Sequence, residues 1–484
     1  MGLAGILVAL GFLMWLSFRG WSVLLLAPAV AIIAAALAGE PLLAHWTQTF
    51  MNSAAQFIAQ FFPIFLLGAL FGKLMDDSGS VHAIAHFMSS RLGERRAILA
   101  VVLAGALVTY GGVSLFVAFF VLAPMARALF RVADIPHRLM PAAIALGTST
   151  FTMSALPGTP ALQNTIPMPF FGTTPFAAPG LGIIAAAIML AFGLWWLRYA
   201  EASARKSGEG YGGDAEFGTG VAADDQFIRE RATSSHEFDP AEIAHGKRSN
   251  APPPIGTAII PLLVVVGVNL LMSFLILPRL DFSFLAQERW GATSLAGVAG
   301  VWSVAVALAA ASATLVALNR ARLTDLRASM DAGANASVLP IFSVASLVGF
   351  GAVVAALPAF ALVRDWVLSI SGGPLVSLAI ATNVLAALTG SASGGLTIAL
   401  DALGNTYLQI AQTNHIDPGL LHRIAVIGSG TLDSLPHNGA VVTLLAVCGS
   451  THRNSYFDIV MANIVGPLIA LAAVIILGSM LGSF

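Results

Sequence analysis

The chain has 484 residues, of which 57% are apolar and only 10% are charged, and its mean hydropathy is +0.85. About a quarter of the residues in a typical soluble domain are charged, so this composition disfavours an ordinary cytosolic enzyme. The net charge of −1 lacks the basic excess of a nucleic-acid-binding protein. The single cysteine, Cys448, excludes an intramolecular disulfide and a cysteine metal cluster. The sequence therefore predicts a polytopic membrane protein, with no indication of a metal or a cofactor.

Apolar stretches of membrane-spanning length recur along the whole chain. A helix needs about 20 apolar residues to cross a ~30 Å hydrocarbon core. The residues before Arg19 are apolar and do not form a short basic segment, so we interpret the first two stretches as transmembrane helices and not as a signal peptide. The candidate spans are residues 3–18, 21–39, 57–75, 139–160, 181–199, 256–278, 293–318, 336–357, 423–447 and 457–482.

Two further apolar stretches, 98–130 and 375–409, contain Gly and Ser at their centres and are too short for two full crossings each. Arginines flank the first stretch on both sides, and basic residues collect on the cytoplasmic side of a membrane. We therefore predict a re-entrant hairpin that enters from the cytoplasm. The same rule places the N-terminus outside, the second hairpin on the external face, and Arg423 among the few external basic residues.

An internal repeat supports opposite orientations of the two halves. The segment from Thr152 to Ala161 matches the segment from Thr431 to Ala440 without gaps at an offset of 279, and the same offset places Ser114 on Ser393. The predicted fold class is an all-α membrane protein with two inverted-topology repeats, each having about five spanning helices and one re-entrant hairpin. The predicted units are a first repeat, a flexible cytoplasmic linker and a second repeat, at 1–200, 201–254 and 255–484.

The linker carries 16 of the charged residues in the chain and is rich in Gly and Ser. Such a composition cannot bury enough apolar surface to offset the entropy of ordering. Both a simple tether and a regulatory or docking loop fit it.

Gly-, Pro- and Ser-rich breaks interrupt four apolar segments, at 111–114, 154–160, 390–395 and 433–439. Unpaired backbone groups cost several kcal/mol each in hydrocarbon, so such breaks must be buried or line a wet cavity. Secondary transporters bind their substrates at paired breaks of this kind. The alternative is that the hydroxyls only satisfy helix backbone or allow close packing. The candidate substrate-binding residues are Gly111, Gly112, Ser114, Thr152, Ser154, Thr159, Ser391, Ser393, Ser434 and Asn438.

Three titratable residues lie in or near these breaks and are candidates for proton coupling: Asp433, His437 and Asp401. Ionisable residues inside a membrane are functional candidates by default. Asp433 is preferred because its repeat partner is Ser154, so the charge occurs in one half only. It could instead cap a helix, His437 could be a satisfied polar residue, and Asp401 could lie at the outer interface.

The segment Gly68-Ala-Leu-Phe-Gly-Lys-Leu-Met-Asp-Asp-Ser-Gly79 ends the third span. A solvated helix end with a Gly stop accounts for its charges, and an inner gate is the functional alternative. This segment, with Gly93-Glu-Arg-Arg96 and the hairpin after it, resembles the GKLMEDSG signature of the gluconate:proton symporter (GntP) family. The resemblance implies the ion transporter superfamily, inverted repeats with re-entrant hairpins, and proton-coupled uptake of gluconate, a related sugar acid or 3-hydroxybutyrate.

The first hairpin departs from the gluconate pattern, because Tyr110-Gly-Gly-Val-Ser-Leu-Phe116 stands where gluconate permeases carry an acidic residue. This difference favours a smaller hydroxy acid or another monocarboxylate.

The sequence thus predicts an alternating-access symporter of the plasma membrane, with an elevator-like movement and an organic anion and H⁺ as its partners. Na⁺ coupling is an alternative, because hydroxyls and carbonyls also ligate that ion, and a homodimer is left open. A different class is an intramembrane serine hydrolase using Ser114 and His437, which requires contact between the two side chains. We expect no enzyme, because the Gly-x-x-Ser pattern recurs in both repeats as part of the scaffold.

Overall fold

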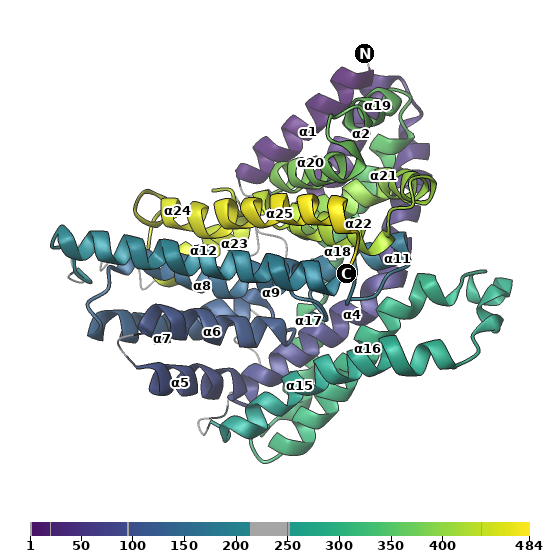
Figure 1. The fold of residues 1–484 in the computed structure, drawn as a ribbon. Coiled ribbons are helices and arrows are strands. Elements are labelled where there is room, and N and C mark those ends of the chain that lie inside the picture. The colour runs from purple at the N-terminus through teal and green to yellow at the C-terminus, as the bar shows by residue number, and fades with distance from the viewer. Residues whose placement is uncertain (1, 20, 94–95, 213–248, 250–251, 437) are drawn as a thin grey trace.

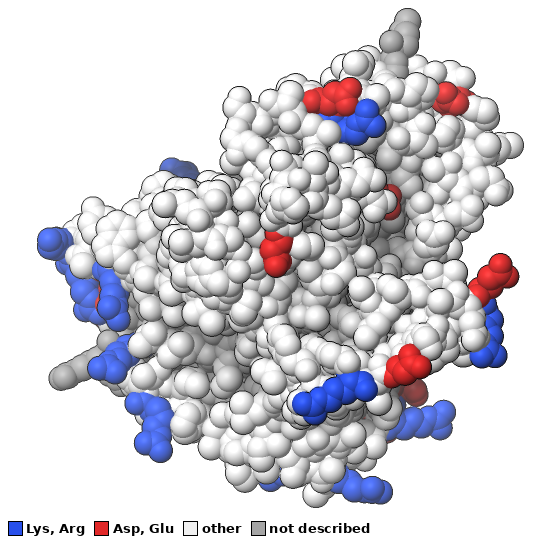
Figure 2. All heavy atoms as spheres, turned by 45° about the vertical axis from the view of Figure 1, so that its right-hand side comes forward, with Lys and Arg blue, Asp and Glu red and all other residues white. Residues whose placement is uncertain are grey.

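The computed structural model describes residues 2–212, 249 and 252–484 apart from 20, 94–95 and 437. Every regular element in this part of the chain is a helix. Seven helical segments are long and apolar enough to cross a membrane, which agrees with the predicted polytopic class. Figure 2 shows a face that is mostly uncharged, with few and scattered charged side chains, and such a surface suits contact with lipid.

The first half consists of a helix pair, a long helix, a short helix, a helical hairpin, a broken helix and a long final helix (Figure 1). In chain order these are α1 (Gly2–Phe18) and α2 (Val23–Ala38); α3 (Leu42–Ala44), η1 (His45–Phe50) and α4 (Met51–Asp77); α5 (Ser80–Leu92); α6 (Ala97–Tyr110) and α7 (Leu115–Val132); η3 (His137–Leu139), α8 (Met140–Thr148), α9 (Phe151–Ser154), α10 (Leu162–Thr165) and α11 (Pro167–Phe171); and α12 (Pro179–Lys206).

The second half repeats this order of elements. They are α15 (Ile255–Leu271), η4 (Met272–Ile276), η5 (Leu277–Arg279), η6 (Ser283–Ala286), η7 (Glu288–Trp290) and α16 (Leu295–Asn319); α17 (Leu326–Ala336) and α18 (Val338–Ala356); α19 (Phe360–Leu368); α20 (Gly373–Thr389) and α21 (Ala392–Thr413); α22 (Pro418–Ser429), η8 (Leu432–Ser434) and α23 (Gly439–Cys448); and α24 (His452–Val460), η9 (Met461–Val465) and α25 (Gly466–Leu481).

Contacts between the halves occur in reciprocal pairs. Helix α4 packs against α16, and its counterpart α18 packs against α2; α7 contacts α23, and α21 contacts α11; α5 contacts α15, and α19 contacts α1. A two-fold relation between the halves would produce this reciprocity. The counterparts α12 and α25 lie side by side (Figure 1). They run antiparallel, since Gly180 N at the start of α12 donates to Phe484 O just after α25 (2.8 Å).

Helix boundaries differ from the predicted spans where polar residues or prolines occur. The predicted span 57–75 is the apolar part of one longer helix, Leu42–Asp77, because backbone hydrogen bonding continues through the π-helical turn η1. The predicted spans 139–160 and 423–447 unwind near Pro157 and Pro436, each of which lacks a backbone donor. Helix α12 continues through Lys206, past the expected start of the linker, and most of the linker lies outside the described residues.

Candidate functional site

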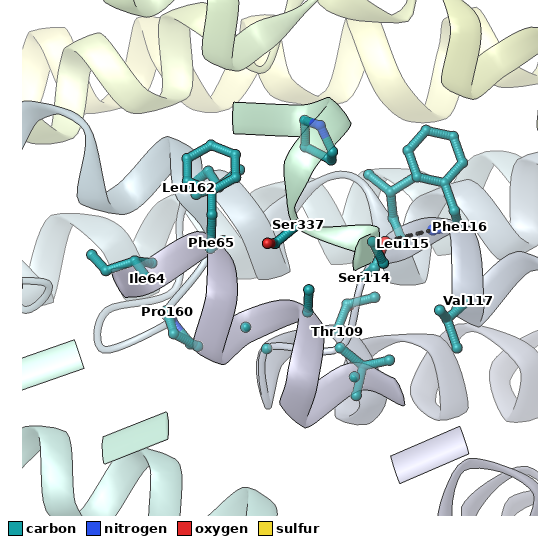
Figure 3. Close-up of a pocket in the computed structure, with 18 of the residues that line it drawn as sticks. Ile64, Phe65, Thr109, Ser114, Leu115, Phe116, Val117, Pro160, Leu162 and Ser337 are labelled. Carbon is teal, nitrogen blue, oxygen red and sulfur yellow. Dashed lines mark hydrogen bonds between the residues drawn. The ribbon is translucent and has the colours of Figure 1, made fainter. Parts of the chain in front are cut away.

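A cavity of about 170 Å³, here called the main cavity, lies where the two hairpin turns meet the first break. Its walls come from α4, the α6–α7 turn, the break after α9, the junction of α17 with α18, and the start of α21. Figure 3 shows apolar side chains of α4 and of the break surrounding this space together with Ser337. The polar lining side chains are Lys73, Asp76, Gln163, Thr109, Ser114, Ser337 and Ser393.

The turn of the first hairpin requires glycine at two successive positions. A Cβ on Gly111 would lie 2.1 Å from Cδ2 of Leu262 on α15. Gly112 has φ +96°, in the left-handed region that favours glycine, and a Cβ there would lie 2.8 Å from Cγ of Pro160. The turn is therefore wedged between α15 and the first break. Ser114 follows it as the N-cap of α7, with its hydroxyl accepting a hydrogen bond from Phe116 N (3.3 Å).

The turn of the second hairpin is built in a similar way. Gly390 has φ +65°, and its carbonyl accepts a hydrogen bond from Nδ2 of Asn438 (2.7 Å). Ser391 caps α21 by accepting from Gly394 N (3.2 Å), and its hydroxyl lies 3.2 Å from that of Ser393. Asn438 also caps α23 by accepting from the backbone of Ala440 (2.7 Å).

The N-termini of α7 and α21 therefore converge on one space. Ser114 and Ser393, which the repeat offset pairs, both line the main cavity. A helix N-terminus presents free backbone amides and the positive end of the helix dipole, so it attracts anions. Two such termini with adjacent hydroxyls form an arrangement that can bind a carboxylate.

A second, small cavity of about 30 Å³ lies against the two breaks. It contains Ser154, Asp433, Ser434 and Asn438 from the predicted set, and the Ser434 hydroxyl donates to Oδ1 of Asp433 (3.3 Å). The two cavities have Leu115, Met153 and Gln163 in common in their walls. The predicted residues are thus divided between two adjoining spaces, and His437 lies outside the described residues.

Other predicted residues face away from both cavities. The Thr152 hydroxyl is fully buried and donates to Gly147 O (3.2 Å). The buried Thr159 hydroxyl accepts from Ala161 N (3.3 Å). Asp401 is exposed on α21. For the two threonines the geometry matches the alternative in which hydroxyls satisfy backbone.

The charges at the end of α4 are buried, so the interpretation as a solvated helix end is wrong. Lys73, Asp76 and Asp77 are 7%, 2% and 1% exposed, because α17 packs over this part of α4. Lys73 Nζ lies 3.1 Å from Asp77 Oδ1, and Asp77 Oδ2 accepts a hydrogen bond from the hydroxyl of Ser329 on α17 (2.6 Å). Lys73 and Asp76 both line the main cavity, so the site contains charged side chains as well as hydroxyls.

Arg423, which was expected among the few external basic residues, has a fully buried side chain on α22. Its guanidinium donates to Ala177 O (2.7 Å) and to Ser154 O (3.4 Å). It also donates to Oδ1 of Asn164 (3.3 Å). Arg423 therefore ties the second repeat to both sides of the first break, and it replaces there the backbone partners that the unwound chain has lost.

Comparison with known proteins places this architecture in a family. The model of the GntP family permeases matches residues 1–170. The uncharacterized transporter YxjC of Bacillus subtilis (strain 168) is 41% identical over 484 residues, covering 99% of this chain and 98% of that protein. This chain belongs to the GntP permease family.

Two further matches concern parts of this permease or its fold. The high-affinity gluconate transporter of Escherichia coli (strain K12) is 39% identical over 105 residues, which cover 21% of this chain and 23% of that protein. The crystal structure of the Alcanivorax borkumensis YdaH transporter covers 90% of this chain and 89% of its own, with a TM-score of 0.51 and 15% identity. The second match concerns the fold alone. The GntP-family permease is accordingly a helical, multi-span membrane transporter.

Proposed function

We propose that this permease carries a small hydroxycarboxylate together with protons across the plasma membrane by alternating access. The observation that carries the proposal is the convergence of the N-termini of α7 and α21, with Ser114 and Ser393, on the main cavity. These termini suit the carboxylate, and the hydroxyls among the mostly apolar walls suit a substrate that both donates and accepts hydrogen bonds. The partial match to a gluconate transporter supports the same substrate class.

Asp433 is the proposed proton carrier. It lies in the small cavity, with Ser434 donating to its carboxylate, and the small cavity adjoins the main cavity through Gln163. A carboxylate beside the substrate site can exchange a proton as the site opens to either side. Sodium coupling is the competing proposal, with hydroxyls and carbonyls as the ligands of the ion.

Alternating access follows from the repeat relation. Antiparallel packing of α12 against α25, which are counterparts, supports halves that cross the membrane in opposite directions. Two equivalent arrangements of the hairpins would then open the cavity to opposite sides. In the proposed orientation the N-terminus lies outside and the linker lies in the cytoplasm. The two hairpins are the proposed moving part.

Uptake into proteoliposomes tests the function. Labelled 3-hydroxybutyrate and gluconate are supplied with an inward proton gradient, with or without sodium. We expect the proton gradient to drive accumulation, and Asp433→Asn to reduce accumulation to the level of equilibration. Asp365→Asn, at an exposed carboxylate of α19, is the matched control and should accumulate as wild type does. Accumulation driven only by sodium would contradict proton coupling, and failure of both acids to move would contradict the substrate class.

A further inference from the structure

Gln163 is a buried amide with one unsatisfied oxygen. It lies on α10, just after the first break at 154–160, and is 7% exposed. Its side chain lines both the main and the small cavity. Its Oε1 is buried, and no described residue donates a hydrogen bond to it. Buried polar atoms almost always have a partner, so an orphan acceptor in a cavity wall indicates a ligand.

The neighbouring amide shows that the fold can satisfy such a group at this place. Asn164 is fully buried, and its Nδ2 donates to Thr159 O (3.0 Å) and to Pro175 O (2.9 Å). Its Oδ1 accepts from Nη1 of Arg423 (3.3 Å) and lies 3.2 Å from Nε2 of His422. Asn164 therefore has partners on both ends of its amide, and this side chain holds the break together. The adjacent Gln163 oxygen is buried without such a donor among the described residues, although the residue lines both cavities.

The chemistry of the missing partner is restricted. A carbonyl oxygen only accepts hydrogen bonds, so its partner must bring an O–H or N–H group. The carboxylate of an anionic substrate offers only acceptors and suits the helix N-termini instead. A hydroxyl on the same substrate is a donor that can reach Gln163 while the carboxylate stays at α7 and α21.

We propose that Gln163 Oε1 accepts a hydrogen bond from a hydroxyl of the substrate and thereby selects hydroxycarboxylates over unsubstituted carboxylates of the same length. This inference rests on the proposed function and adds to it the residue that recognises the hydroxyl. A site built to bond a hydroxyl rejects the analogue without one, because the buried protein group is then left unpaired. The repeat partner of Gln163 is Val442, so this recognition belongs to one half only.

Exchange in proteoliposomes preloaded with unlabelled 3-hydroxybutyrate tests the selectivity, because exchange needs no ion gradient. The measured quantity is the concentration of competing 3-hydroxybutyrate or butyrate that halves the exchange of labelled 3-hydroxybutyrate. For wild type we expect the ratio of these concentrations, butyrate over 3-hydroxybutyrate, to be about ten or more. For Gln163→Met, which keeps the length of the side chain, we expect this ratio to fall toward one, through weaker binding of 3-hydroxybutyrate. Gln409→Met, at an exposed position of α21, should keep the wild-type ratio.

Thermal unfolding of the purified proteins in detergent gives an independent readout. Gln163→Met removes an unpaired buried oxygen, so we expect its unfolding temperature to equal or exceed that of wild type. Asn164→Leu should unfold at a clearly lower temperature, because it breaks the contacts of a satisfied amide. A lower unfolding temperature of Gln163→Met would reveal a structural partner and overturn the proposal.

The remaining outcomes separate the two proposals. Equal weakening of both acids in Gln163→Met, or an unchanged ratio, overturns the role of Gln163 and leaves the transport function intact. Equal competition by both acids in wild type would also overturn the role of Gln163 and leave the transport function intact. Absence of any exchange by wild type overturns the proposed function, and the selectivity proposal falls with it.

Discussion

Lys73 and Asp77 illustrate what burial requires of a charged side chain in this fold. The two groups are one helical turn apart on α4 and form an ion pair at 3.1 Å. Ser329 donates to the other carboxylate oxygen, so the carboxylate is both paired and hydrogen-bonded. Removing one partner of a buried pair costs more than the pair itself contributes, because the remaining group keeps the cost of its desolvation. The ion pair therefore stabilises the buried contact between α4 and α17.

Asp77→Asn is expected to destabilise the permease by about 3–5 kcal/mol, because it removes the carboxylate beside buried Lys73. The matched control is Asp331→Asn, which removes the acidic partner of an exposed pair with the same spacing, Arg327 with Asp331. Exposed pairs contribute only about 0–1 kcal/mol. The free energy of unfolding in detergent, followed by denaturant titration, checks both variants. Equal stability of the two variants would contradict the assignment of a structural ion pair.

At the scale of elements, the two hairpins differ at a matched position close to their turns. Position 395 in α21 is a glycine, and a Cβ there would lie 2.3 Å from the backbone of Ala386 on α20. The repeat partner in the first hairpin is Phe116, a large buried side chain. The second hairpin thus depends on close backbone contact between its arms, whereas the first carries a large buried side chain at the matched position. The two hairpins are related by the repeat without being equivalent in packing.

Gly395→Ala is expected to separate the arms of α20 and α21 and to destabilise the fold by about 1–3 kcal/mol or more, because backbone atoms cannot move aside as a side chain would. Gly267→Ala is the control, since no atom lies within 4 Å of its Cβ position in α15, and alanine favours the helix by up to ~1 kcal/mol. Thermal unfolding in detergent measures both. A Gly395→Ala variant as stable as Gly267→Ala would mean that the arms are not in backbone contact.

At the scale of the whole molecule, the sequence predicted the features that depend on local pattern and missed those that depend on packing. Gly, Pro and Ser clusters at one repeat offset correctly located both hairpin turns and both breaks. The burial of Asp77 and Arg423 was missed because distant segments cover them, namely α17 and the chain on both sides of the first break. Gln163 and Asn164 are adjacent amides in the sequence. Only tertiary contacts show that the side-chain oxygen of Asn164 has hydrogen-bond donors and that of Gln163 has none among the described residues.

The opposite orientation of the two halves can be tested with one pair of serines. Ser90 on α5 and Ser369, just after α19, are both exposed and are separated by the repeat offset of 279. The native Cys448 is fully buried, so single cysteines at the two positions can be labelled over a low background. In intact cells we expect a membrane-impermeant maleimide to label Ser369→Cys and not Ser90→Cys, because the basic Arg91 predicts a cytoplasmic end there.

Permeabilised cells serve as the control, and both variants should then react. Labelling of both cysteines in intact cells would mean that α5 and α19 lie on one side of the membrane, and it would contradict inverted halves. Labelling of Ser90→Cys alone would keep the inversion and reverse the orientation, with the N-terminus and the linker exchanging sides. The inverted halves and the external N-terminus are therefore separable by one pair of variants, because inversion requires opposite reactivity and orientation fixes which cysteine reacts.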